Sequence, residues 1–150
     1  MKLYLGNKMV GIRQFNFPWF DAAAAELRSL AVVTEVFNPA ERDRETGFYP
    51  DPECLGTVED MARLNFSRRE ALGTDWAWIA NYSDGMIAGQ DWAKSTGTIS
   101  EIACHQALGL PVYEYPVFMA YWNKPHLPKM KLPPIMELGG RIEAWSDLRG

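Results

Sequence analysis

Two acidic residues in the second half of the chain, Asp75 and Glu101, have residue types and spacings that could support catalysis. Glu101 follows Gly97 and Thr98 at the predicted start of a helix, and a glycine there lets a ligand approach the backbone closely. A helix N-terminus favours the ionised form of a nearby carboxyl group, which a carboxylate nucleophile requires. The same Thr-x-x-Glu spacing is typical of a capping box, in which Glu101 would only satisfy backbone N–H groups. Both roles of Glu101 stay open at this level.

Asp75 is open to two interpretations of the same kind. The apolar positions Leu72, Trp76 and Ile79 predict the buried face of a helix, and a helix here would turn Asp75 toward that inner face. An unpaired carboxylate is unfavourable there, which favours a functional role. Asp75 could instead cap a helix that begins just after Thr74.

Other reactive or aromatic side chains are predicted to be structural. Cys104 and His105 follow Glu101 by about one helical turn, but adjacent positions on a helix point apart and do not form a dyad. Three tryptophans could stack on a base, although packing in the core is the commoner use of tryptophan. These are Trp76, Trp78 and Trp92. Two histidines in the whole chain leave little room for a His-based zinc site, and no metal is expected.

The elements that must hold these residues alternate along the chain between strands and helices. Short apolar or β-branched runs predict strands at 2–6, 32–37, 85–89 and 111–115. Helical periodicity follows Pro18, recurs around 72–79 and spans 98–108. This alternation predicts an α/β, Rossmann-like open parallel sheet with helices on both faces.

The predicted sheet also indicates where a ligand would bind, because open parallel sheets bind ligands outside the carboxyl ends of their strands. The segments expected there are the loops after the first and third strands and the start of the helix that carries Glu101. The candidate ligand-binding residues on these segments are Gly6, Asn7, Met9, Gly89, Ser95, Gly97 and Thr98.

Composition and charge limit the class of protein. The 150 residues are 47% hydrophobic and carry a net charge of −4, which is typical of a globular domain and argues against a broad basic face for polymeric nucleic acid. No apolar run approaches the roughly 18 residues of a membrane helix. Two cysteines indicate a reduced, cytoplasmic protein. We therefore expect a soluble domain without a membrane partner.

The domain is predicted to span 1–115, with a long insertion at about 42–67 where the periodicity breaks down. An apolar patch near Met61 predicts a short helix within this insertion. Several prolines after position 115 oppose long regular elements, so 116–150 is predicted to be an extended, Pro-rich C-terminal arm.

Two groups of sequence blocks resemble known proteins. The N-terminal blocks are KLYLG at 2–6, MVGI at 9–12, FNFPWF at 15–20 and FNPAE at 37–41. They resemble the DUF4406 proteins, small proteins that are common in phages and prophages and are related to nucleoside 2-deoxyribosyltransferases. The later blocks are DWAWI at 75–79, SDGMI at 83–87 and STGTISEI at 95–102. They are similar to blocks of the 2′-deoxynucleoside 5′-monophosphate N-glycosidases.

The resemblance implies a flavodoxin-like fold and attack at the anomeric carbon of a nucleoside or nucleotide, without a cofactor. Glu101 would be the nucleophile that forms a glycosyl-enzyme intermediate, and Asp75 would contact or protonate the departing base. Ser95 stands six positions before Glu101, where the transferases carry an aspartate and the monophosphate hydrolases a serine. A hydroxyl can donate a hydrogen bond to a 5′-phosphate that a carboxylate would repel.

The expected function is therefore cleavage of the N-glycosidic bond of a nucleoside 5′-monophosphate or nucleoside, by hydrolysis or by transfer. Two alternatives stay open: a phage protein that binds or sequesters a nucleotide without turnover, and an NAD-type glycohydrolase that uses the same Glu101. The loop at 6–11 departs from the family pattern Gly-Pro-Met-Thr-Gly, which indicates a changed substrate or lost activity. The relatives imply a homo-oligomer, a dimer or larger, in the host cytoplasm if a phage encodes it.

Overall fold

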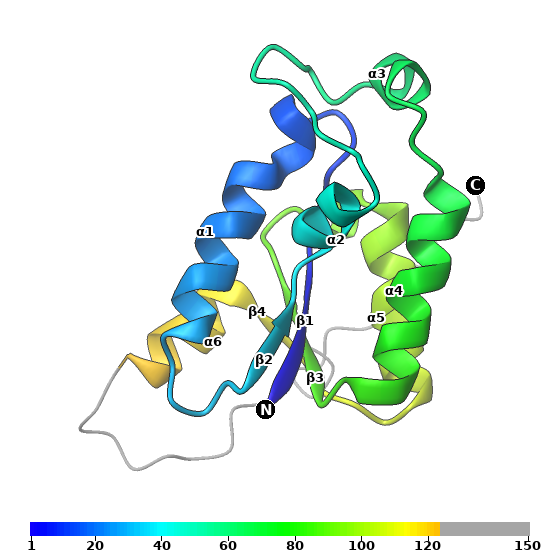
Figure 1. Cartoon of the computed structure of the whole chain (residues 1–150). Coiled ribbons are helices and arrows are strands. Elements are labelled where there is room, and N and C mark those ends of the chain that lie inside the picture. Colours follow the sequence, from blue (N-terminus) through cyan, green and yellow to red (C-terminus); the bar gives the residue numbers. More distant parts are fainter. Residues whose placement is uncertain (124–150) are drawn as a thin grey trace.

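A four-stranded sheet forms the centre of the computed structural model, which describes residues 1–123 (Figure 1). All strands are parallel and lie in the order β2-β1-β3-β4. They are β1 (Lys2–Gly6), β2 (Glu35–Phe37), β3 (Gly85–Ala88) and β4 (Val112–Glu114). The open parallel sheet that the alternation of elements predicts is confirmed.

Helices cover both faces of this sheet in a flavodoxin-like arrangement (Figure 1). The helices α1 (Phe17–Arg28) and α6 (Tyr115–Trp122) pack on one face, and α4 (Arg68–Tyr82) and α5 (Thr96–Ala107) pack on the other. The side chains of β1 alternate between the two faces, as in any strand. Leu3 and Leu5 join the core beneath α1, whereas Tyr4 joins the core beneath α4 and α5.

Strand β2 is shorter than the strand predicted at 32–37. It lies at the edge of the sheet and pairs with β1, and Glu35 already faces Lys2 at the start of β1. Earlier residues have no strand beside them, and they turn instead, with the N–H of Val33 donating to the carbonyl of Leu30 at 2.9 Å. A prediction from β-branched residues alone therefore makes this strand too long.

Helix α4 presents a different face to the core from the one that Leu72, Trp76 and Ile79 predict. Trp76 is 41% exposed, whereas Trp78 is 8% exposed and packs in the core with Ile79. Asp75 occupies one of the buried positions of the helix. Because a carboxyl group takes an inner position, apolar periodicity alone cannot locate the buried face.

The insertion at 42–67 is built around a buried aromatic cluster. Helix α2 (Pro39–Glu45) leads into it, and α3 (Val58–Arg63) confirms the short helix predicted there. Phe48 is 4% exposed, and its ring centroid lies 5.2 Å from that of Phe15 and 4.5 Å from that of Phe66. Main-chain hydrogen bonds also join the insertion to the loop after β1. The insertion is thus folded against the rest of the domain.

The C-terminal segment begins as a helix, in contrast to the extended arm predicted for 116–150. Pro116 lies in the first turn of α6, where the N–H that proline lacks is not needed. Phe118 and Met119 are buried against the sheet. The remainder of the predicted arm, 124–150, lies outside the described residues. Within 1–123, no helix is long and apolar enough to cross a membrane.

Candidate active site

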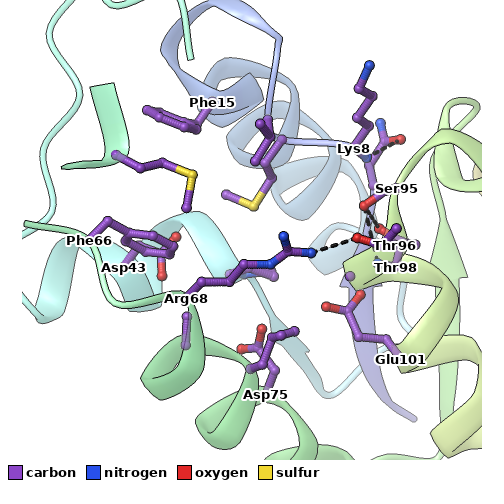
Figure 2. A pocket seen from close by; sticks show the side chains of 18 of the residues that line it. Lys8, Phe15, Asp43, Phe66, Arg68, Asp75, Ser95, Thr96, Thr98 and Glu101 are labelled. Atoms are coloured by element: carbon purple, nitrogen blue, oxygen red, sulfur yellow. Dashed lines mark hydrogen bonds between the residues drawn. The ribbon is translucent and has the colours of Figure 1, made fainter. Parts of the chain in front are cut away.

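A cavity of about 490 Å³ opens at the carboxyl ends of β1 and β3 (Figure 2). These two strands are neighbours, but the chain runs from β1 to β2 on one side and reaches β3 on the other. Such a switch in strand order leaves a crevice in which parallel α/β sheets bind ligands. The loop after β1, the start of α5, and the helices α2 and α4 all contribute to the lining. The cavity lies where the sequence predicts a ligand site.

Three buried carboxyl groups face this cavity: Asp43 from α2, Asp75 from α4 and Glu101 from α5. The three residues are 7%, 8% and 6% exposed, respectively. Apart from the hydroxyl of Tyr4, no residue in the described part of the chain offers any of them a side-chain hydrogen bond. Buried carboxyl groups are normally paired or hydrogen-bonded, so three open ones in one cavity indicate a functional site.

Burial raises the pKa of all three carboxyl groups. The pKa of Glu101 rises to about 8, and those of Asp75 and Asp43 rise to about 7, chiefly because burial disfavours the charged form. The charge of Asp75 further raises the pKa of both Glu101 and Asp43. Asp75 is therefore coupled electrostatically to both of the other carboxyl groups.

The hydroxyl of Tyr4 lies next to both Asp75 and Glu101. Tyr4 belongs to β1 and is completely buried, and burial together with the two carboxyl groups raises its pKa well above the usual value. In return, the hydroxyl lowers the pKa of each carboxyl group relative to burial alone. No described partner completes a hydrogen bond of ordinary geometry with this hydroxyl. Because its pKa is raised, the hydroxyl of Tyr4 stays protonated and can donate to whichever carboxyl group is charged.

Helix α5 is capped by Ser95 and not by a capping box that includes Glu101. The Ser95 Oγ accepts hydrogen bonds from the N–H of Thr98 at 3.2 Å and from the hydroxyl of Thr98 at 3.0 Å. The helix begins at Thr96, so Glu101 lies in its second turn, and the capping-box interpretation is wrong. The expected preference of Glu101 for its ionised form is also wrong, because burial and the charge of Asp75 raise its pKa.

Asp75 lies inside α4 and does not cap it. The helix begins at Arg68, and the side chain of Ser67 caps it by accepting a hydrogen bond from the N–H of Glu70. The alternative in which Asp75 faces inward is therefore confirmed. Figure 2 shows Asp75 and Glu101 on neighbouring helices at the same cavity.

Gly6 leaves the space that the carboxyl group of Glu101 occupies. A Cβ atom at position 6 would lie 2.9 Å from Oε2 of Glu101 and 2.3 Å from Cε of Met86. The absence of a side chain at the end of β1 therefore allows Glu101 to pack against this strand.

Gly89 and Asn7 bring together the loops that follow β3 and β1. A Cβ atom on Gly89 would lie 2.3 Å from Cγ of Asn7. The Oδ1 of Asn7 accepts hydrogen bonds from the N–H of Lys8 at 2.8 Å and from the N–H of Asp91 at 3.2 Å. The side chain of Asn7 thus joins the two loops across the switch point.

Most of the site residues predicted from the sequence meet at this cavity. Those that line it are Asn7, Met9, Asp75, Ser95, Gly97, Thr98 and Glu101. Gly6 and Gly89 do not line it; they pack directly behind residues that do.

A basic group at the cavity was missed by sequence reasoning. Arg68 reaches from the start of α4 toward α5, where its Nη2 donates to Oγ1 of Thr96 at 2.6 Å (Figure 2). Lys8 and Lys94 also line the cavity, and Lys94 pairs with Asp91 at 2.8 Å. No motif marks Arg68, whose position only becomes relevant once α4 and α5 lie side by side.

An aromatic wall was missed as well. Phe15 and Phe66 line the cavity near Asp43, and Phe66 and Asp43 both come from the insertion (Figure 2). Phe15 has a φ of 51°, and Gln14 and Asn16 beside it also have positive φ. Such a run is unfavourable for residues other than glycine. No tryptophan of the described chain lines the cavity. Trp78 packs in the core and Trp92 packs against it, as the sequence favours, whereas Trp76 is exposed.

His105 is structural, as predicted. It is completely buried, with Nδ1 2.8 Å from the carbonyl oxygen of Glu101 and Nε2 2.9 Å from Oγ of Ser83. A carbonyl oxygen can only accept, so Nδ1 carries the proton, and burial lowers the pKa of the ring and keeps it neutral. This hydrogen bond supports the turn of α5 that carries Glu101. Among residues 1–123, no group of His, Cys, Asp and Glu side chains is arranged to hold a metal ion.

Comparison with known proteins bears on the domain that holds this cavity. No curated protein and no solved structure gives a match to the chain. The family described as "Domain of unknown function (DUF4406)" matches residues 1–114. This match runs from β1 through β4 and includes every residue that lines the cavity. The DUF4406 resemblance of the N-terminal blocks is thereby confirmed, and the chain belongs to the DUF4406 family.

Proposed function

We propose that the protein cleaves the N-glycosidic bond of a nucleoside 5′-monophosphate, or of the nucleoside, with Glu101 as nucleophile and Asp75 beside the departing base. The observation that carries this proposal is the pair of buried, coupled carboxyl groups on one cavity at the switch point of the sheet. The resemblance to monophosphate N-glycosidases and deoxyribosyltransferases supports the choice of reaction.

In the proposed first step, a carboxylate oxygen of Glu101 forms a bond to C1′ as the bond between C1′ and the base nitrogen breaks. The electron pair of that bond goes to the base, which takes a proton from Asp75. Water, or a second base, then attacks C1′, returns a proton to Asp75 and releases Glu101. The negative charge of Glu101 stabilises the oxocarbenium-like transition state.

The coupled pair supports this mechanism because it holds about one proton near neutral pH. The productive form has the proton on Asp75 and the charge on Glu101. The hydroxyl of Tyr4 favours that form when it donates to Glu101, since its own raised pKa keeps it protonated.

The groups at the start of α5 support a 5′-phosphate. The Ser95 oxygen accepts both hydrogen bonds from Thr98, so Ser95 still has its own O–H proton to donate to a ligand. One N–H of Arg68 is used by Thr96, and a guanidinium has further donors for phosphate oxygens. Lys8 lines the same part of the cavity, and a helix N-terminus favours an anion.

The opposite part of the cavity supports a planar base. Phe15, Met61 and Phe66 give it an apolar wall. The cavity volume of about 490 Å³ lies within the range of about 300–1,000 Å³ that small-molecule sites have.

The direct test is to incubate the protein with nucleoside 5′-monophosphates, the matching nucleosides and NAD, and to measure free base or nicotinamide by chromatography. We expect base release from at least one monophosphate and its loss in Glu101→Gln. Glu70→Gln, which changes an exposed residue of α4 outside the cavity, is the matched control and should retain activity. Release by Glu101→Gln at the wild-type rate, or no release from any compound, would contradict the proposal.

A second candidate function is nucleotide binding without turnover. The pKa of about 8 favours it, because a protonated Glu101 donates a hydrogen bond to a ligand and does not attack it. Thermal stabilisation by a nucleotide that is afterwards recovered intact would support this candidate. Nicotinamide release from NAD in the same panel would instead indicate an NAD-type glycohydrolase.

We also propose that the chain forms a homo-oligomer in the cytoplasm, which would be that of the host if a phage encodes it. Trp76 and Tyr82 on α4 are 41% and 56% exposed, and large apolar side chains of this kind favour contact with a second copy. Light scattering is expected to give a dimer or larger, and a monomer would contradict this part of the proposal.

A further inference from the structure

Asp43 is a buried carboxyl group at the cavity that the proposed reaction does not use. It lies in the last turn of α2, is 7% exposed and lines the cavity together with Phe66 (Figure 2). No hydrogen bond reaches its carboxyl group from the described residues. The neighbouring Arg44 pairs instead with Asp21, through N–H···O bonds of 2.9 and 2.6 Å. A buried acceptor that opens into a cavity calls for a donor on the ligand.

The order of groups along the cavity indicates which part of a nucleotide would reach Asp43. Asp75 is coupled electrostatically to both Glu101 and Asp43. Figure 2 shows Asp43 on one side of the cavity, Glu101 on the other and Asp75 in between. Figure 2 shows Glu101 close to Thr98, on the side of Ser95, whereas Asp43 lies on the aromatic side. A nucleotide with C1′ at Glu101 and its leaving nitrogen at Asp75 would direct the far edge of its base to Asp43.

The exocyclic group at the far edge of a base is either an amino group, which donates hydrogen bonds, or an oxo group, which accepts them. A carboxylate can only accept. We propose that Asp43 selects nucleotides whose base has an exocyclic amino group at its far edge, adenine or cytosine, over the oxo counterparts hypoxanthine and uracil. This inference rests on the proposed function. Asp43 is then a specificity residue supplied by α2 at the start of the insertion.

The test uses pairs of nucleotides that differ in this one group: adenosine and inosine 5′-monophosphates, and cytidine and uridine 5′-monophosphates, with their 2′-deoxy forms. At pH 8, above its pKa of about 7, Asp43 is mainly a carboxylate. We expect the amino member of a pair to have a kcat/KM roughly tenfold to a hundredfold higher. Asp43→Asn should bring that ratio close to one, because an amide group both donates and accepts.

The matched control is Glu45→Gln on the same helix. Glu45 is exposed, pairs with Arg42 and does not line the cavity, so this variant should keep the wild-type preference.

Calorimetric titration of the same nucleotides into Glu101→Gln protein separates this inference from the proposed reaction. If no nucleotide is cleaved, the proposed function fails, but an amino preference in binding that Asp43→Asn removes still supports the role of Asp43. Equal turnover or binding of the amino and oxo members would overturn the inference. So would a preference that survives in Asp43→Asn, or the absence of any nucleotide binding.

Discussion

The carboxyl groups of Asp75 and Glu101 hold protons at a pH at which exposed carboxyl groups have lost theirs. Burial is the main cause. Among the described residues, Tyr4 is the side-chain donor that can stabilise a charge on either carboxyl group by a hydrogen bond. Perturbed acids of this kind cluster where proton transfer or nucleophilic attack takes place. The proposed reaction therefore depends on how one proton is divided between two side chains.

The pH dependence of base release follows from this division. We expect kcat/KM to trace a bell with its maximum between about 7 and 8, the pKa values of Asp75 and Glu101. On the acid side both groups are protonated and there is no nucleophile; on the alkaline side both are charged and there is no acid. The measurement is initial rates of base release across pH at low substrate. A maximum near the usual carboxyl pKa of about 4 would contradict the assignment.

A second prediction concerns Gly6, where the absence of a side chain leaves room for Glu101. Gly6→Ala would place a methyl group 2.9 Å from the Glu101 carboxyl group and 2.3 Å from Met86, so we expect a loss of roughly 1–3 kcal/mol in unfolding free energy and a loss of base release. Gly73→Ala is the control, because Gly73 lies inside α4 with no atom within 4 Å of the new Cβ. It should stabilise the protein by about 0.5–1 kcal/mol. Denaturant unfolding and base release measure both effects, and unchanged activity in Gly6→Ala would count against the assigned position of Glu101.

Each carboxyl group of the site is carried by a different helix, and the sheet decides where those helices begin and end. The ends of β1 and β3 lie side by side, so the loops after them and the start of α5 converge on one edge. Helices α4 and α5 pack against each other on the same face, which brings Asp75 to Glu101. The insertion then closes the aromatic side of the cavity with Phe66.

The start of α5 has two roles that a single substitution can separate. Ser95→Ala removes the helix cap, which should lower the unfolding free energy by about 1 kcal/mol. It also removes the proposed phosphate donor, so the monophosphate should bind roughly tenfold more weakly while its nucleoside binds as before. Titration calorimetry with the two ligands measures this difference. An equal loss for both ligands would show that Ser95 acts through the helix alone.

For the folded molecule, the buried carboxyl groups reduce stability as the pH rises. The folded pKa of Glu101 is about 8 and its ordinary value is 4.5, so between these values the folded protein keeps a proton that the unfolded chain releases. A raised carboxyl pKa therefore contributes stability at low pH, and that stability is lost as the pH rises toward 8. The buried carboxyl groups of this site therefore lower the stability of the whole protein near neutral pH, as is common for functional sites.

This linkage predicts how Glu101→Gln changes unfolding. The variant should gain stability relative to wild type between pH 5 and pH 8, by on the order of 2–4 kcal/mol, because a glutamine has no proton to lose. Denaturant unfolding of both proteins at the two pH values gives this double difference directly, and titrating groups that are not coupled to Glu101 cancel from it. A difference of zero, or one of opposite sign, would show that the pKa of Glu101 is not raised in the folded protein.

The sequence by itself determined the order of strands and helices, because apolar periodicity, prolines and glycines act over a few residues. It placed Glu101 on the helix after β3 and Asp75 on the helix before that strand. Its N-terminal blocks also indicated the family whose model matches 1–114. It also located the loops after β1 and β3, since the carboxyl ends of parallel strands share one edge.

Only the tertiary structure decided which side of each helix is buried and which distant residues meet. Asp43, Phe66 and Arg68 reach the cavity because α2, the insertion and α4 fold over the ends of the central strands, and no local pattern records such contacts. Whether Glu101 caps its helix or enters the cavity depends equally on packing, since the cap lies at Ser95. Burial is a property of the whole packed chain, and the raised pKa values that define the site follow from it.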